Sequence, residues 1–379
     1  MRTSRRTFLQ SSLAVAVGFR GLHRLFADSN VLSADAEQRI SPGYGPLISD
    51  PNGQLDLPKG FRYTLFSTQR TKMDDGFLVP GKHDGMGSFP GPDGTTLLIR
   101  NHEMMPDWTA IGGFGTENEL FKDVPREFFF DAGHGVKPCL GATTTLVYNT
   151  KKQKLEKHFL SLAGTQFNCA GGTTPWGTWI TCEENTDVAG EHYEQDHGYP
   201  FEVPARADGG LTKPVPIKAM GRFRREAIAV DPRTGIVYQT EDLKDGIITR
   251  FIPDRPGELL AGGRLQALCI ADKTPCDMRN WTEDEGKPIP CENIPVGQSL
   301  ATRWIDLHDV EAPKDDLRYR AAANGAAVFA RAEGIWYGND AVYIACTNGG
   351  KIGAGQIFRY LPSHKEGTSS EADSPGRLE

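Results

Sequence analysis

Short apolar runs, bounded by residues that favour turns, recur along the whole chain. Runs of about four to eight such residues predict strands, and Gly, Pro, Asp and Asn between them predict turns. One helix is predicted over residues 318–330, where Asn324-Gly325 interrupts the pattern. An entering strand is predicted at residues 55–68, and further strands are predicted at residues 95–100, 143–148, 157–162, 178–182, 227–231, 236–240, 249–252, 265–270, 341–347 and 356–360.

Several of these strands share one repeated phrase: a turn, a short apolar strand, and then polar or acidic residues. Equivalent strand ends converge in radial all-β folds. We therefore expect an all-β chain that forms a β-propeller with long loop insertions, and carboxylates that converge to bind cations. The phrase occurs as FPGPDGTTLLIRNHE (89–103), TPWGTWITCEE (174–184), VDPRTGIVYQTED (230–242) and, with Thr and Asn replacing the acids, WYGNDAVYIACTNGG (336–350). The insertions are expected at residues 112–139, 187–218 and 272–300.

The N-terminus has the pattern of an export signal. Residues 4–10 form a twin-arginine motif, and the apolar run at 13–19 is too short to span a bilayer. We expect residues 1–27 to be this signal, 28–50 a linker, 51–362 the propeller and 363–379 a disordered tail. The protein is then periplasmic or secreted, its partner during export is the twin-arginine translocase, and it has no stable membrane anchor.

Composition narrows the function classes. The 379 residues include 43 Gly and 25 Pro, which fits many short strands in one large β domain. The formal charge is −7, and removal of residues 1–27, which carry five arginines and no acidic residue, makes it −12. A protein with this negative charge is expected to bind nucleic acid and anionic membranes poorly. We expect a monomer that acts on a small molecule.

Cysteine usage and missing motifs add further limits. The seven cysteines are an odd number, and Cys276 and Cys291 bracket a polar loop in which they could form a disulfide. The sequence contains no GxxxxGK[ST], GxSxG or HExxH motif. Histidine is scarce, with nine residues, which argues against a histidine-rich zinc or iron site.

Candidate ligands stand at the strand ends. Asn101-His102-Glu103 offers oxygen and nitrogen ligands at one point, and Cys169 lies in a Gly-rich segment where its thiolate would need a metal or a positive neighbour. Glu183-Glu184 and Glu241-Asp242 are adjacent pairs, so at most one of each pair faces a central site while the strand continues. Each pair could equally lie in a solvated loop, but their recurrence favours a calcium site.

Two further segments combine Arg with Glu. Glu226 follows three arginines within residues 221–226, a cluster that could also be a surface ion-pair network. Arg331 and Glu333 share one face of an extended chain, so one could hold a phosphate while the other binds metal. An exposed surface pair is the alternative for these two residues.

Longer motifs carry a resemblance to a known family. The chain resembles the PhoX-type alkaline phosphatases over roughly residues 57–362. The motifs that carry this resemblance are NCAGGTTPWGTW with TCEE, GRF with EA and AVDP, ARAEG with WY, and the C-terminal GGK with GAGQIFRY. The resemblance implies a six-bladed propeller exported by the twin-arginine route. It also implies a site with Ca²⁺ and Fe³⁺ that hydrolyses phosphomonoesters through a metal-bound oxygen nucleophile.

The same resemblance implies roles for individual residues. Cys169 would be the thiolate ligand to iron, and Glu333 with one or both of Glu226 and Glu241 would be carboxylate ligands. Arg331 would hold the substrate phosphate. With the strand-end acids, the expected metal ligands are Glu103, Cys169, Glu183, Glu184, Glu226, Glu241, Asp242 and Glu333.

Two departures from the family pattern keep other functions open. Arg224-Arg225 stands where the family commonly has Ser-His, and the family continues beyond Glu379 with a last blade that bears an Asp-Asn motif, so an incomplete last blade is expected. The alternatives are a non-catalytic, metal-stabilised binding propeller and a calcium-dependent propeller hydrolase that acts on lactones or phytate.

Overall fold

The computed structural model describes residues 43–281, 283–284, 287–288 and 293–379. The chain divides into two compact units, residues 1–65 and residues 66–379. In the described part of the first unit, β1 (Leu47–Ile48) pairs with β2 (Leu57–Pro58). Only these two residues of the entering strand predicted at 55–68 are strand. The predicted export signal at 1–27 and most of the linker at 28–50 lie outside the described residues.

The second unit contains two small antiparallel sheets that follow the chain order. Every strand in them pairs with its neighbour in sequence. The four-stranded sheet contains β3 (His83–Pro90), β4 (Thr95–His102), β5 (Gly141–Asn149) and β6 (Lys154–Thr165). The three-stranded sheet contains β7 (Asn168–Thr173), β8 (Thr178–Glu183) and β9 (Pro200–Pro204).

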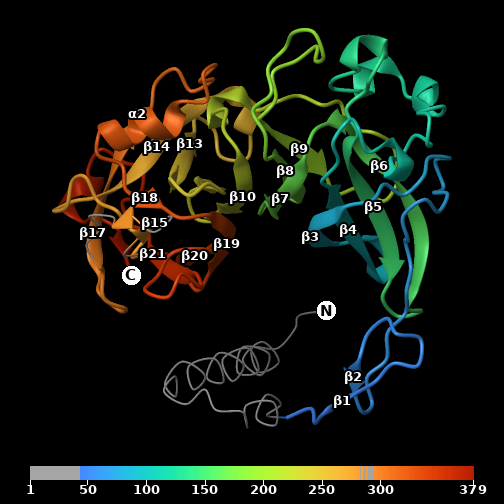
Figure 1. The fold of residues 1–379 in the computed structure, drawn as a ribbon, viewed down its shortest axis with the longest axis horizontal. Coiled ribbons are helices and arrows are strands. Elements are labelled where there is room, and N and C mark those ends of the chain that lie inside the picture. Colours follow the sequence, from blue (N-terminus) through green and yellow to red (C-terminus); the bar gives the residue numbers. More distant parts are fainter. Residues whose placement is uncertain (1–42, 282, 285–286, 289–292) are drawn as a thin grey trace. The chain divides into compact units, whose positions relative to one another are not determined.

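A nine-stranded sheet follows, in the order β10-β11-β13-β14-β17-β22-β21-β20-β19. Its two end strands, β10 and β19, contact each other, so the sheet is nearly closed. Figure 1 shows these strands in yellow to red, next to the green β7–β9 sheet. The strands are β10 (Arg225–Val230), β11 (Val237–Glu241), β13 (Thr249–Pro253), β14 (Gly263–Ile270), β17 (Leu300–Asp306), β19 (Ala332–Gly338), β20 (Ala341–Cys346), β21 (Gln356–Leu361) and β22 (Arg377–Leu378).

Helices and minor strands occupy the connections. The helix α2 (Leu317–Ala323) is shorter than predicted, because the chain turns at Asn324-Gly325 and then forms β18 (Val328–Phe329), which pairs with β12 (Gly246–Ile247). β15 (Glu283–Asp284) pairs with β16 (Lys287–Pro288). The 3-10 helices are η2 (Pro92–Gly94), η3 (Thr109–Ile111), η4 (Phe121–Asp123), η5 (Arg126–Phe128), η6 (Gly133–Gly135), η7 (Lys218–Met220), η8 (Leu259–Ala261) and η9 (Glu371–Asp373).

The described chain is mostly β, as predicted, and each strand predicted between residues 95 and 360 coincides with an observed one. The propeller and its six blades stay expectations. The core explains why the predicted strands form: β8, for example, is covered on both faces. Ile180 and Cys182 pack in one buried apolar cluster with Phe223, while Trp179 packs in another with Phe201. Burial of apolar side chains on both faces therefore stabilises β8.

The C-terminal residues differ from the expectation. The prediction that residues 363–379 form a disordered tail is wrong, because β22 pairs with both β17 and β21 and so joins them into one sheet. Glu366 is buried and accepts hydrogen bonds from the hydroxyls of Tyr238 and Tyr360, at 3.0 and 2.8 Å. Leu378 is fully buried. These residues are polar in sequence, but they are held by specific partners.

Two further predictions fall partly outside the described residues. Cys291, the proposed disulfide partner of Cys276, is not among them. Within the part of the chain that the structure describes, no helix combines the length and apolar character needed to cross a membrane.

Candidate metal centre

Four hairpins place one chemically reactive side chain each at the same position. In the hairpins β3–β4, β7–β8, β10–β11 and β19–β20, the strand register shifts at the start of the first strand. Such β-bulges re-aim side chains and are frequent next to active sites. The bulges contain Asp84, Cys169, Glu226 and Glu333, and in every case the next residue is Gly or Ala.

A second side chain comes from the other strand of each hairpin. The residue before each bulge side chain pairs with the last residue of the second strand, as in His83↔His102 and Asn168↔Glu183. The residue directly after that strand end therefore lies beside the bulge. These residues are Glu103, Glu184, Asp242 and, in the fourth hairpin, Thr347. This arrangement is the structural form of the repeated phrase in the sequence.

The first strands of the four hairpins are neighbours: β3 contacts β7, β7 contacts β10, and β10 contacts β19 (Figure 1). Their bulge side chains consequently meet. The Cys169 thiol donates to Glu226 Oε1 at 3.1 Å and lies 3.6 Å from Asp84 Oδ1. The ligand atoms of Cys169, Glu184 and Glu226 lie within 4.8 Å of one another, as do those of Asp84, Glu103 and Cys169. We call this cluster the Cys169 centre.

The electrostatics of the Cys169 centre show crowded acids. Burial, the neighbouring Glu184 and further acids raise the pKa of Glu226 to about 8. Burial and then Asp242 and Glu103 raise the pKa of Glu184 to about 7. Burial also raises the pKa of Glu103 and of Asp84. The protein alone therefore does not compensate the charge of these carboxylates.

The Cys169 thiol is affected in the same direction. Burial, with Glu226 and Asp84, raises the pKa of this thiol well above its usual range. A thiolate would be strongly disfavoured here without an added cation. Carboxylate oxygens are the ligands of Ca²⁺, and a thiolate with carboxylates suits a transition metal such as iron. The donor set of the Cys169 centre thus fits both expected ions.

Arg331 supplies a cation at the edge of the centre. Its Nε and Nη2 donate to the two oxygens of Asp242 at 2.9 and 2.7 Å, and Nη2 also donates to Glu333 Oε1 at 2.9 Å. The Thr347 hydroxyl donates to the same Glu333 oxygen at 2.7 Å. The hydrogen bond with Asp242 raises the pKa of Arg331, so its guanidinium stays charged. Its side chain is 42% exposed, which makes it accessible to a ligand.

Glu183 and Glu241 were expected among the metal ligands, but the structure does not place them in the Cys169 centre. Glu183 is fully buried on the opposite side, where it accepts the backbone N–H groups of Gln166 and Gly198 at 2.9 and 2.8 Å. It also accepts from His197 Nδ1 at 2.7 Å. This carboxylate already has its partners within the protein.

Glu241 lies in a second buried position away from the cluster. Its Oε1 is 3.6 Å from Arg318 Nη1, and its Oε2 accepts from the backbone N–H of Ile247 at 3.3 Å. Burial raises the pKa of Glu241 to about 8, although Arg318 opposes that shift. Of the expected ligands, the structure therefore brings together Glu103, Cys169, Glu184, Glu226, Asp242 and Glu333 near Arg331.

Neighbouring residues hold the β7 bulge in place. Asn101 donates from Nδ2 to the carbonyl oxygens of Cys169 and Ala170 at 3.0 and 2.8 Å, so it positions a ligand instead of acting as one. His102 is buried against the Gly81 carbonyl and the Thr144 hydroxyl, both at 2.9 Å. A Cβ at Gly85 would lie 2.7 Å from Ala170 Cα, so only glycine allows β3 and β7 to approach this closely.

Sequence reasoning missed Asp84 and Thr347 as members of the centre. Asp84 precedes a glycine in a segment without a clear strand pattern, although the structure places it in β3. The signal that would have found it is the shared dipeptide of a ligand followed by Gly or Ala. That dipeptide occurs as Asp84-Gly85, Cys169-Ala170, Glu226-Ala227 and Glu333-Gly334.

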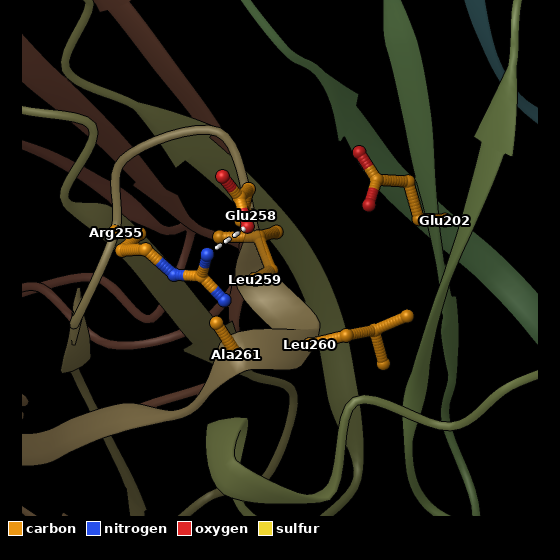
Figure 2. Close-up of a pocket in the computed structure, with 6 residues that line it drawn as sticks. All are labelled: Glu202, Arg255, Glu258, Leu259, Leu260 and Ala261. Atoms are coloured by element: carbon orange, nitrogen blue, oxygen red, sulfur yellow. Dashed lines mark ion pairs between the residues drawn. The ribbon is translucent and has the colours of Figure 1, made fainter.

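A separate hollow of about 390 Å³ does not have the chemistry of a site. Figure 2 shows Arg255 pointing toward Glu258, with which it pairs at 2.8 Å, and Glu202 on β9 across from Leu260. Glu202 accepts hydrogen bonds from Trp176 Nε1 and the Thr178 hydroxyl, both at 2.7 Å. Both carboxylates thus have partners, so we place the site at the Cys169 centre.

Comparison with known families identifies one match. The family model described as Alkaline phosphatase PhoX matches residues 42–153 and 141–373. No curated protein matches the chain.

Proposed function

The chain belongs to the alkaline phosphatase PhoX family, which indicates a phosphatase. From this premise we propose that it is a periplasmic or secreted phosphomonoesterase and that its Cys169 centre holds Ca²⁺ and Fe³⁺. The observation that carries the proposal is the fourfold repeat of the hairpin ends. It gathers a thiol, carboxylates and an arginine at one accessible place.

The residues divide by donor type. Cys169, Glu226 and Glu333 would hold iron, because the thiolate needs an acidic transition metal. Asp84, Glu103, Glu184 and Asp242 would hold calcium through oxygen atoms. Bound cations of this kind neutralise the carboxylates and stabilise charge on the oxygens of the transferring phosphoryl group.

Arg331 would bind the substrate phosphate. A guanidinium matches two phosphate oxygens at once. Asp242 accepts hydrogen bonds from Nε and Nη2 of Arg331. Within the described residues no hydrogen bond from Nη1 is found, so this nitrogen could donate to a phosphate. Arg224, which is exposed, lowers the pKa of Glu184 by its charge and so contributes positive potential at the same centre.

The proposal is tested by aryl-phosphate hydrolysis of the natively metallated protein with and without calcium, together with iron measured per chain. We expect calcium-dependent turnover and bound iron, both lost in Cys169→Ala. The matched control is Cys182→Ala, since Cys182 is a buried core thiol on β8 and lies outside the centre. Turnover that survives Cys169→Ala would refute the role of this thiol. Wild-type protein with iron but no turnover would instead support a metal-stabilised binding propeller.

A further inference from the structure

A second group of metal-binding side chains lies on the other side of the β8 end. Asp131, Cys139 and His197 place their ligand atoms within 4.8 Å of one another, and all three are fully buried. Asp131 and Cys139 lie at the two ends of one short segment between η5 and β5, and His197 comes from the distant loop before β9. We call this group the Cys139 cluster.

We propose that the Cys139 cluster is a structural site for a zinc-class divalent cation. Its donors would be Cys139 Sγ, His197 Nε2 and an oxygen of Asp131. A cysteine, a histidine and a carboxylate together are a donor set that zinc uses. This inference concerns residues outside the Cys169 centre and does not depend on phosphatase activity.

The distances within the cluster fit one shared ion. His197 Nε2 lies 3.8 Å from Cys139 Sγ and 3.2 Å from Asp131 Oδ2. For a tetrahedral ion with typical zinc bond lengths, these two separations would be about 3.6 Å and about 3.4 Å. These two separations need shifts of only a few tenths of an ångström, and the third, between Cys139 Sγ and the Asp131 oxygen, lies within 4.8 Å, so the three donors surround one common point.

The surrounding hydrogen bonds resemble those of a prepared metal ligand. His197 Nδ1 contacts Glu183 Oε1 at 2.7 Å, which leaves Nε2 facing the other two donors. A carboxylate on the remote nitrogen of a ligating histidine orients the ring and strengthens its metal bond. The rings of Phe130 and Tyr193 pack edge-on to the imidazole, each at 5.4 Å, and hold it further.

Gln166 supplies independent evidence for a ligand. Its side chain is fully buried and its amide nitrogen lies 3.7 Å from Cys139 Sγ, while its oxygen Oε1 has no hydrogen-bond partner among the residues that the structure describes. Buried carbonyl oxygens without partners are rare. The amide nitrogen and oxygen exchange places on rotation by half a turn, and that rotation would give the ion a fourth donor.

The alternative is that a proton on His197, instead of a metal cation, balances the negative charge of the carboxylates around the Cys139 cluster. Burial lowers the pKa of His197, but Glu183 and then Asp131 outweigh burial and raise that pKa well above its usual value. A buried imidazolium between two carboxylates results. This arrangement leaves the Gln166 oxygen without a partner among the described residues. Binding of a dication would release the proton of His197 Nε2 and that of Cys139 Sγ to solvent, and the charge of the cluster would be conserved.

The consequence for the fold is a cross-link. Cys139 leads into the β3–β6 sheet, whereas Glu183 and His197 belong to the β7–β9 sheet and the loop that enters it. One ion would connect these sheets and, through Glu183, fix the strand end that carries Glu184. Because the cluster is buried, the ion would enter during folding and would resist chelators afterwards.

The test is metal analysis of the full chain refolded with Zn²⁺ and dialysed against a chelator. We expect one retained zinc per chain in the wild type and none in Cys139→Ser, with zinc retained in Cys269→Ser, a control at a fully buried thiol in another core cluster. Equal zinc in wild type and Cys139→Ser, or no zinc in the wild type, would overturn the proposal.

A spectroscopic measurement keeps the proposal testable if Cys139→Ser fails to fold. Wild-type protein refolded with Co²⁺ should show a thiolate-to-cobalt charge-transfer band and intense tetrahedral absorption in the visible range. Cys169→Ser should keep both signals, which separates this site from the Cys169 centre. Wild type without these bands, or loss of the bands in Cys169→Ser, would contradict the inference.

Discussion

Two cysteine clusters lie on opposite sides of the end of β8, and they use adjacent glutamates. Glu184 faces the partly exposed Cys169 centre, where further acids surround it. Glu183 faces the buried Cys139 cluster, where backbone N–H groups and His197 satisfy it. The two residues have the same chemistry and neighbouring positions, but their partners differ completely.

The contrast teaches how to separate ligands from structural acids. A buried carboxylate with several donors is stabilised by the protein itself. A carboxylate whose neighbours are mostly other acids is stabilised only by a proton or a cation. By this criterion Glu184 and Glu226 need cations for their stabilisation, and Glu183 does not. Asp131 also has a backbone N–H donor at each oxygen, so it would offer a remaining lone pair to an ion bound in the Cys139 cluster.

The largest expected effect is at Glu183. Glu183→Gln should destabilise the fold by about 3–5 kcal/mol, because it removes the buried carboxylate that pairs with His197 and places an amide N–H₂ where one oxygen now accepts from backbone N–H groups. Thermal and chemical unfolding measure this loss. Glu202→Gln is the control, since Glu202 is only partly buried and accepts hydrogen bonds from Trp176 and Thr178. Equal stability losses in the two variants would erase the contrast between Glu183 and an ordinary hydrogen-bonded acid.

Arg331 should affect turnover without affecting the fold. Arg331→Ala should lower kcat/KM on the order of 10²–10³-fold, a typical loss for a donor that contacts developing charge, and should leave the melting temperature nearly unchanged. Arg233→Ala is the matched control, because Arg233 has the same 42% exposure and a comparable pair with Asp231 at the other end of the β10–β11 hairpin. A similar kinetic loss in both variants would argue against a role for Arg331 at the phosphate.

After the metal ions are removed with a chelator, the stability of the fold should depend on pH, because the carboxylates of the Cys169 centre lie close together. The pKa of Glu226 is raised to about 8 and that of Glu184 to about 7, from a usual 4.5. The folded, metal-free chain thus binds more protons than the unfolded chain between these values, so its stability falls as pH rises from about 4.5 to about 8. Added calcium should restore the melting temperature at pH 8.

The Glu184→Gln variant sharpens the same measurement. Without metal it should flatten the pH dependence and raise stability at pH 8 by about 1 kcal/mol, since it removes one like charge from a group still partly open to solvent. With calcium it should lower the stabilisation that calcium provides. A metal-free variant that is less stable than wild type at pH 8 would mean that Glu184 is a structural acid like Glu183.

The smallest effect on turnover is expected at Thr347. Thr347→Val removes the 2.7 Å hydrogen bond to Glu333 and should cost about 0.5–1.5 kcal/mol in transition-state stabilisation, a drop in kcat/KM of roughly tenfold or less. Thr96→Val, which removes a 2.9 Å hydroxyl contact at the far end of β4, should not change kcat/KM. An unchanged rate in Thr347→Val would show that Glu333 needs no such support.

The sequence predicted the second strand of each of the four hairpins, because the buried positions of these strands are apolar on one or both faces. Side-chain alternation along a strand limits each acid pair to one residue that faces the site, but it does not say which residue, so Glu183 and Glu241 stood among the expected ligands beside Glu184 and Asp242. The first strands of three hairpins, β3, β7 and β19, were not predicted. They contain glycines such as Gly85, Gly171 and Gly334, which weaken a strand pattern and resemble a turn.

The Cys139 cluster could not be predicted from pattern at all. Its ligands lie in or beside long irregular segments, where neither periodicity nor spacing predicts which residues meet. Their approach depends on how the loops before β5 and β9 pack against the sheets. The C-terminal strand β22 was missed for a related reason, because its two residues are fixed by pairing with β17 and β21 and not by local propensity.

Gly85 has a consequence for the choice of ion. Its missing Cβ lets the backbones of β3 and β7 approach so closely that a methyl group would collide with Ala170. The separation of these backbones sets the span between Asp84 and Cys169, and hence the radius of the ion that both can touch. Gly85 therefore limits the size of the ion. Gly85→Ala should increase the distance between Asp84 and Cys169 and shift the preference of the Cys169 centre toward larger cations.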